Sequence, residues 1–175
     1  KKIKVQSIFN FFKKGKTAIA LPTTDMHSHL IPGIDDGAKT LQKSVEYIRG
    51  MSDLGFKKII TTPHIMGDFY PNTPEVILSG LEEVRAAVLK ENIPVEIGAA
   101  AEYFADDFFM ELLDSKTQLL TLPGNRLLIE FSTLAPPGTA FETIFKLKTS
   151  GYQPILAHPE RYVYWANKFE IFEKL

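Results

Sequence analysis

The feature that most constrains the fold is a repeated alternation of strand and helix patterns from Thr23 onward. Each repeat has a short apolar stretch that ends in a polar residue, then a turn, then a helical pattern. The strands predicted in this way cover residues 24–30, 57–64, 94–102, 126–132 and 153–158. A period of about 30 residues is typical of βα units, which build a parallel sheet buried on both faces. The period fits an open sheet and a barrel equally well.

The helices between these strands are predicted from their end signals. Thr73 is a helix N-cap, and Pro74 and Glu75 occupy the first turn that follows it. Gly55 ends a helix that begins near Thr40. The other helices are expected at residues 106–113, 139–150 and 168–175.

Length and composition limit the number of domains and the kind of chemistry. The 175 residues fit one domain. With 20 basic and 21 acidic side chains the net charge is −1, which gives no general attraction to nucleic acid. The chain has no cysteine, which excludes disulfide scaffolds, thiolate-bound metals and cysteine nucleophiles. The apolar runs are far shorter than the about 20 residues of a membrane-spanning helix, so we expect a cytoplasmic protein.

The first 22 residues differ in composition from the rest. Six lysines lie within residues 1–16, around four large apolar side chains. The segment has neither the continuous apolar core nor the small-residue cleavage site of a signal peptide. We therefore expect residues 1–22 to form a basic, aromatic arm that packs its phenylalanines on a domain of residues 23–175. Contact of this arm with a membrane surface is the alternative.

All four histidines lie at the carboxyl ends of predicted strands. His27 and His29 end the first strand, His64 the second and His158 the fifth, while Glu102 ends the third. In parallel α/β folds the carboxyl ends of the strands meet at one edge, where sites are built. We therefore expect these five side chains to converge on one site.

The spacing of the first two histidines suits a metal. Side chains alternate along a strand, so Asp25, His27 and His29 point the same way, with neighbouring Cα atoms about 6.6 Å apart. Imidazole and carboxylate ligands without sulfur suit zinc, manganese or iron. The two oxygens of Glu102 can bridge two cations. For His64 taken alone, an ordinary role in the core or on the surface is equally open.

Three further charged residues follow these strands. Arg161 lies three residues beyond His158, and its planar guanidinium matches phosphate oxygens, with a surface salt bridge to Glu160 as the alternative. Asp35 and Asp36 lie in a Pro-Gly-Ile-Asp-Asp-Gly turn, where carboxylates also serve turn formation and helix capping. The position of the two aspartates in the sequence does not decide between a functional role at the site and these structural roles.

Two other segments near this edge have two interpretations each. The small side chains of residues 98–101 either leave room beside a metal or substrate or allow a strand to pack closely on a helix. Tyr162, Tyr164 and Trp165 either line an entrance for an aromatic substrate or pack a loop onto the core.

Taken in order, these motifs are similar to those of a known superfamily. Asp-Met-His-Ser-His ends at His29, Pro-Gly-Ile-Asp-Asp-Gly at Gly37, Thr-Pro-His at His64, Ala-Glu-Tyr at Tyr103 and Ala-His-Pro-Glu-Arg at Arg161. The set resembles the polymerase and histidinol phosphatase (PHP) superfamily. Within it, the set is most similar to the bacterial manganese-dependent tyrosine phosphatases of capsule and exopolysaccharide operons. The resemblance extends from Thr24 to the C-terminus.

The resemblance implies a fold and a metal centre. The fold would be a distorted (β/α)7-type, TIM-like barrel whose C-terminal strands this chain lacks. The centre would hold up to three divalent metals, with manganese favoured and iron or zinc as alternatives. Its ligands would be His27 and His29 on the first metal, Glu102 bridging to a second metal with His64 and His158, and Asp36 on the third.

The resemblance also implies an activity. Arg161 would bind the phosphate, and Glu102 and Asp36 would take part in catalysis, with metal-activated hydroxide as the nucleophile. The substrate would be phosphotyrosine on a bacterial tyrosine kinase that regulates capsular or exopolysaccharide synthesis. The family completes its site with an Asp-x-His pair on a late strand, and the sequence after Arg161 has none.

Two other functions fit the same residues. One is a small-molecule phosphate monoesterase, similar to histidinol phosphatase, or an amidohydrolase-like hydrolase, because the paired histidines of a first barrel strand are shared with that chemistry. The other is a non-catalytic regulatory partner, which would keep part of the metal site in order to bind a kinase.

Overall fold

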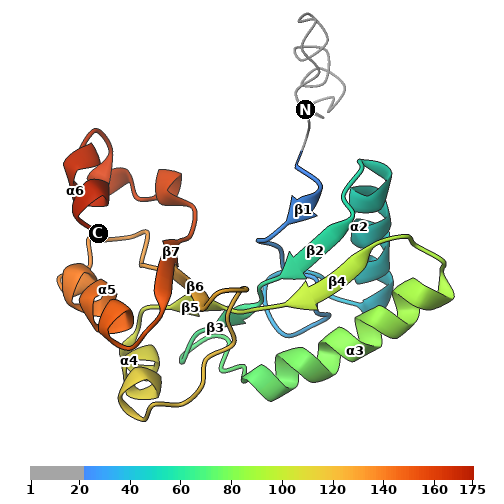
Figure 1. The fold of residues 1–175 in the computed structure, drawn as a ribbon, viewed down its shortest axis with the longest axis horizontal. Helices are drawn as coiled ribbons and strands as arrows, with labels where there is room; N and C mark the ends of the chain where they lie inside the picture. The colour runs from blue at the N-terminus through green and yellow to red at the C-terminus, as the bar shows by residue number, and fades with distance from the viewer. Residues whose placement is uncertain (1–21) are drawn as a thin grey trace, which may run out of the picture.

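The paired strands of the protein all run parallel (Figure 1). The computed structural model describes residues 22–175. Its strands are β1 (Thr24–Asp25), β2 (Lys58–Thr61), β3 (His64–Ile65), β4 (Glu96–Ala99), β5 (Glu102–Phe104), β6 (Arg126–Glu130) and β7 (Gln153–Leu156). Its helices are α2 (Leu41–Asp53), α3 (Pro74–Lys90), α4 (Asp107–Asp114), α5 (Ala140–Thr149) and α6 (Phe169–Lys174), with short 3₁₀ turns η2 (Pro159–Arg161) and η3 (Val163–Trp165). The predicted N-terminal arm lies outside the described residues except for Pro22.

β2 and β3 form one interrupted strand, and β4 and β5 form another beside it. The register pairs Thr61 with Ala99 and His64 with Glu102, so it is the same on both sides of the break. Within the break the Glu102 N–H donates to the carbonyl oxygen of Pro63 at 3.0 Å, which continues the ladder. All five strands predicted from the sequence are therefore present, and they lie side by side in the order of the sequence.

The described strands form two open sheets. Their orders are β1-β2-β4 and β3-β5-β6-β7, and over residues 22–175 they do not close into a barrel. Figure 1 shows α2 and α3 beside the first sheet, and α4, α5 and α6 beside the second. The prediction of an α/β fold with parallel strands is thus confirmed.

The helices begin where their capping residues predict. Thr73 Oγ1 accepts a hydrogen bond from the N–H of Val76, the third residue of α3. Thr40 caps α2 in the same way. One face of α3 is buried at helical spacing, through Ile77, Leu81, Val84 and Val88. This face joins the strands in one apolar core, which fixes the strands and their carboxyl ends. In the part of the chain that the structure describes, no helix is long and apolar enough to span a bilayer.

The structure shows the surroundings of the two segments for which the sequence left two interpretations. Ala100 and Ala101 are closely packed, at 0% and 1% exposure, whereas Gly98 and Ala99 are partly exposed and line a hollow together with Lys58 and Asn125. Tyr162 and Trp165 are also buried, at 1% and 5% exposure. The Tyr162 hydroxyl accepts a hydrogen bond from the N–H of Phe131 at 3.1 Å, which ties the segment after β7 to the end of β6. The aromatic residues therefore pack a loop onto the core.

Candidate metal centre

The centre is built around the carboxylate of Glu102, which is fully buried at the start of β5. Its Oε2 lies 3.1 Å from Nε2 of His27, 3.2 Å from Nε2 of His29 and 3.5 Å from Nδ1 of His64. Its Oε1 lies 3.0 Å from Nε2 of His158. The structure thus brings together all four histidines and the glutamate that the sequence placed at one edge.

The parallel register accounts for this convergence. His64 and Glu102 are direct partners in the ladder between β3 and β5. His27 and His29 follow β1, and His158 follows β7, so each reaches the same edge from the carboxyl end of its strand. His158 has a φ of 27° and a ψ of 61°, a left-handed conformation that is strained for a residue with a Cβ. This turn aims its ring back over the sheet toward Glu102.

The nitrogen and oxygen atoms of the cluster suit metal binding better than they suit a hydrogen-bond network among themselves. Glu102 faces all four imidazoles, and Nδ1 of His64 and Nδ1 of His158 are buried without a hydrogen-bond partner among the described residues. Ligand atoms within 4.8 Å of one another occur in three overlapping groups: His27, Glu102 and His158; His29, His64 and Glu102; and His29, Asp35 and Asp36. Imidazole nitrogens with carboxylate oxygens are a ligand set for manganese, iron or zinc. The residues present therefore fit divalent metals.

The two aspartates of the turn have different surroundings. The side chain of Asp36 is 64% exposed, and its Oδ1 lies 3.8 Å from Nδ1 of His29 and 3.7 Å from Nε2 of His64. The side chain of Asp35 is fully buried, and its Oδ2 lies 2.7 Å from Nδ1 of His29. Asp36 is thus at the open rim of the centre, while Asp35 lies behind it.

Glu130 belongs to the cluster and was missed in the sequence. It ends β6, with Oε1 3.3 Å from Nε2 of His158 and Oε2 3.8 Å from Nδ1 of His64. The predicted strand ran to residue 132, which made Glu130 an interior position. Its pattern is nevertheless that of Glu102, a carboxylate at the end of an apolar strand, and this signal could have identified it.

Burial and hydrogen bonding shift the pKa values of the charged groups in the cluster. Burial lowers the pKa of His29, but the hydrogen bonds to Asp35 and Glu102 outweigh it and raise that pKa to about 10. Burial raises the pKa of Glu102, but the hydrogen bonds from His27 and His29 outweigh it and hold the pKa well below its usual range. Burial, and then the charge of Glu102, raise the pKa of Glu130 to about 7. Negative charge therefore concentrates on Glu102, at the centre of the imidazoles.

An open hollow of about 450 Å³ gives access to this cluster. Its walls are His27, His29, Asp36, Gly37, His64, Glu102, His158, Glu160 and Arg161. Arg161 comes from η2, directly after His158, so the predicted anion-binding residue lies at the rim of the hollow. A guanidinium there faces any phosphate that approaches the cluster.

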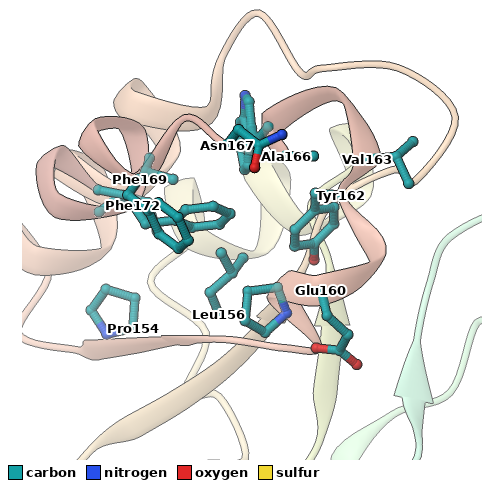
Figure 2. A pocket seen from close by; sticks show the side chains of 13 residues that line it. Pro154, Leu156, Glu160, Tyr162, Val163, Ala166, Asn167, Phe169 and Phe172 are labelled. Atoms are coloured by element: carbon teal, nitrogen blue, oxygen red, sulfur yellow. The ribbon is translucent and has the colours of Figure 1, made fainter.

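A second cavity, of about 700 Å³, lies beside β7 and α6 (Figure 2). Figure 2 shows that apolar side chains such as Leu156, Phe169 and Phe172 form most of its wall, with Glu160 at one edge. Among the described residues that line this cavity there is no histidine. The side chains that could hold a metal therefore lie at the first hollow.

The chain matches a protein-family model and several curated proteins. A family model described as capsular polysaccharide synthesis, CpsB/CapC, matches residues 23–175. Tyrosine-protein phosphatase YwqE of Bacillus subtilis is 33% identical over 140 residues, which are 78% of this chain and 54% of YwqE. Tyrosine-protein phosphatase CpsB of Streptococcus agalactiae serotype V is 29% identical over 149 residues, which are 83% of this chain and 60% of CpsB. The chain thus spans about half the length of the curated relatives it matches.

The fold has a match among solved structures. Crystal structures of YwqE from Bacillus subtilis and CpsB from Streptococcus pneumoniae are described as those of unique metal-dependent tyrosine phosphatases. One chain from these crystal structures superimposes on the present chain with a TM-score of 0.76 and 30% sequence identity. The superposition covers 86% of the present chain and 63% of the chain in the crystal structure. The similarity in sequence and the similarity in fold point to the same group of proteins.

Proposed function

The chain belongs to the CpsB/CapC family of capsular polysaccharide synthesis proteins, and we propose that it carries most of the active site of a metal-dependent protein-tyrosine phosphatase. The observation that carries this proposal is the buried Glu102 carboxylate with four imidazoles around it, open to solvent beside an arginine. The names and descriptions of the relatives supply the reaction and the metal dependence.

Divalent metals at this cluster would be held by His27, His29, Asp36, His64, Glu102 and His158. Glu130 joins this set because its carboxylate faces both His64 and His158. We propose manganese, with up to three ions in a complete site, because the set contains imidazole and carboxylate donors and no sulfur. Bound metals would supply Lewis-acid activation of water and positive charge opposite the phosphate oxygens.

The remaining chemistry is done by the side chains of the protein. Arg161 offers two parallel N–H donors, which can bind two equatorial oxygens of a phosphoryl group and stabilise the charge that develops there. Asp36 lies at the rim and its carboxylate completes the open side of the centre. Tyrosinate leaves readily because the pKa of its parent phenol is about 10, so hydrolysis of phosphotyrosine needs less help from a general acid than hydrolysis of phosphoserine.

We propose that the substrate is phosphotyrosine on a bacterial tyrosine kinase that regulates capsular or exopolysaccharide synthesis in the cytoplasm. The relatives named tyrosine-protein phosphatase support a tyrosine-phosphorylated protein as the substrate class. The open hollow also supports it, because a phosphotyrosine side chain projects from a protein surface and must reach the metals from outside.

We also propose that the five strands are the first part of a distorted (β/α)7-type barrel in residues 23–175. Their spatial order follows the sequence without reversal, which is the order of a barrel and not that of a doubly wound sheet. β1 and β7 are the outermost strands, so further βα units in a protein of the relatives' length would lie between them. The apolar cavity beside β7 supports this, since a further unit would cover it.

A panel of substrates tests the proposed function. With Mn²⁺ present, we expect phosphate release from a phosphotyrosine peptide to exceed that from a phosphoserine peptide and from histidinol phosphate. Arg161→Ala should lower kcat/KM for the phosphotyrosine peptide at least about tenfold while the bound metal is retained. Arg49→Ala is the matched control, because Arg49 makes an exposed ion pair with Glu91 on the helices. Preference for histidinol phosphate would favour a small-molecule phosphatase, and binding of the phosphotyrosine peptide without turnover would favour a regulatory partner.

A further inference from the structure

Asp35 has more hydrogen-bond partners than a residue of a simple turn needs. Its Oδ1 accepts from the N–H of Gly37 at 2.9 Å, and its Oδ2 accepts from the N–H of His64 at 3.0 Å. The same Oδ2 lies 2.7 Å from Nδ1 of His29. One buried carboxylate is therefore shared between the turn, the backbone of one metal-ligand candidate and the ring of another.

The turn that carries Asp35 is fixed on several sides. The N–H of Ala38 donates to the carbonyl oxygen of His29 at 3.0 Å, which joins the turn to the segment that follows β1. Nδ2 of Asn72 donates to the carbonyl oxygens of Ile34 and His64, at 2.9 and 2.8 Å. Asp35 is thus held at a constant position relative to both histidines.

The two ring nitrogens of His29 face different partners. Nδ1 faces Asp35, while Nε2 lies 3.2 Å from Oε2 of Glu102, in the middle of the imidazole cluster. Both partners are carboxylates, which accept hydrogen bonds and donate none. When a metal takes the place of the proton on Nε2, the hydrogen bond to Asp35 keeps the remaining proton on Nδ1. The lone pair of Nε2 then points at the centre of the cluster.

We propose that Asp35 is a positioning residue for the metal centre: it fixes the ring and the tautomer of His29 so that Nε2 is presented to the metal. This role rests on the proposed metal centre. Asp35 itself is not a ligand, because three of its roughly four lone-pair positions already accept hydrogen bonds, two of them from backbone N–H groups and one from His29. The exposed Asp36 is the member of the pair that is free to bind metal.

A double-mutant cycle tests this role without measuring turnover. The affinity of chelator-stripped protein for Mn²⁺ is measured by calorimetry for the unsubstituted protein, Asp35→Asn, His29→Ala and the double variant. If Asp35 acts through His29, Asp35→Asn lowers the affinity about 10- to 100-fold in the natural background and less than about threefold when His29 is already alanine. Equal losses in both backgrounds would mean that Asp35 only holds the turn, and would overturn the proposal.

A second measurement needs no substituted protein, so it stands even if Asp35→Asn fails to fold. In protein loaded with diamagnetic Zn²⁺ and labelled with ¹⁵N-histidine, the ¹⁵N shifts of His29 report which ring nitrogen carries the proton. The proposed role requires a protonated Nδ1 and a metal-bound Nε2, and the opposite assignment would refute it. If the unsubstituted protein bound neither Mn²⁺ nor Zn²⁺, the metal centre itself would be refuted and the role of Asp35 with it.

Discussion

Replacement of Gly37 by alanine should damage the metal centre although Gly37 has no functional group. Gly37 follows the two aspartates, and its backbone lies against His29 in the segment that follows β1. A Cβ added there would overlap the carbonyl oxygen and Cβ of His29, and would lie 2.9 Å from its carbonyl carbon, where ordinary contacts begin at about 3.4 Å. The obstacle is mostly backbone, so it cannot rotate away as the end of a flexible side chain would.

The size of the effect follows from this overlap. To bring these contacts to ordinary distances, the turn or the segment after β1 must move by roughly 1 Å, and the displaced groups include Asp35, Asp36 and His29. Forced overpacking of this kind costs about 1–3 kcal/mol of stability. Displacement of catalytic groups by about 1 Å can cost about 100-fold in rate. We therefore expect Gly37→Ala to lose about 2 kcal/mol in the free energy of unfolding and at least about tenfold in Mn²⁺ affinity.

The assay combines urea denaturation of the metal-free protein with calorimetric titration of Mn²⁺. Gly50→Ala is the matched control, because Gly50 lies inside α2 and an added Cβ there meets nothing within 4 Å. That control should gain about 0.5–1 kcal/mol, since alanine is the better helix former, and should keep its metal affinity. Unchanged stability and Mn²⁺ affinity in Gly37→Ala would show that the turn does not press against His29, and the geometry derived for this side of the centre would be wrong.

Three other changes test separate parts of the account. Glu102→Gln should abolish phosphatase activity and reduce the bound metal measured by mass spectrometry, since a neutral amide replaces the charge that four imidazoles share; full metal content would reject the bridging role. Tyr162→Phe should lower the free energy of unfolding by about 1–3 kcal/mol with metal affinity unchanged, because the buried N–H of Phe131 loses its acceptor; a stability equal to that of the unsubstituted protein would contradict this packing. Mn²⁺ binding should tighten from about pH 5 to pH 8, because the metal must displace protons from Glu130, with its pKa raised to about 7, and from His29, with its pKa raised to about 10. Without metal Glu130 and His29 hold protons more tightly in the folded chain than in the unfolded one. Burial lowers the pKa of His64 and of His158, so above about pH 7 these two are neutral in both states. Denaturation midpoints should therefore fall as the pH rises from about 7 toward about 10, and a rising midpoint in this range would contradict the assignment.

The parts of the fold that depend on local patterns could be predicted from the sequence. The capping residue Thr73 and the buried spacing of α3 are set by the helix itself, so the prediction was correct. The histidines could be placed together because parallel strands bring their carboxyl ends to one edge, whatever the details of packing. The roles of these residues as metal ligands stay a prediction.

The parts that depend on tertiary packing could not be predicted. Asp35 and Asp36 are identical neighbours in the sequence, and only the contact of the turn with His29 buries the first and exposes the second. Pro63 has no N–H to donate, and the strand is interrupted there, which a pattern of apolar residues does not reveal. Glu130 depends in the same way on where β6 ends relative to β7.

The most direct measurement is phosphate release from a phosphotyrosine peptide as metal is removed and returned. The account predicts that chelator-stripped protein is inactive, and that activity returns in proportion to the Mn²⁺ bound at the cluster around Glu102. Turnover that survives complete removal of metal would contradict the account, as would a folded, fully metal-loaded protein that releases no phosphate from the peptide.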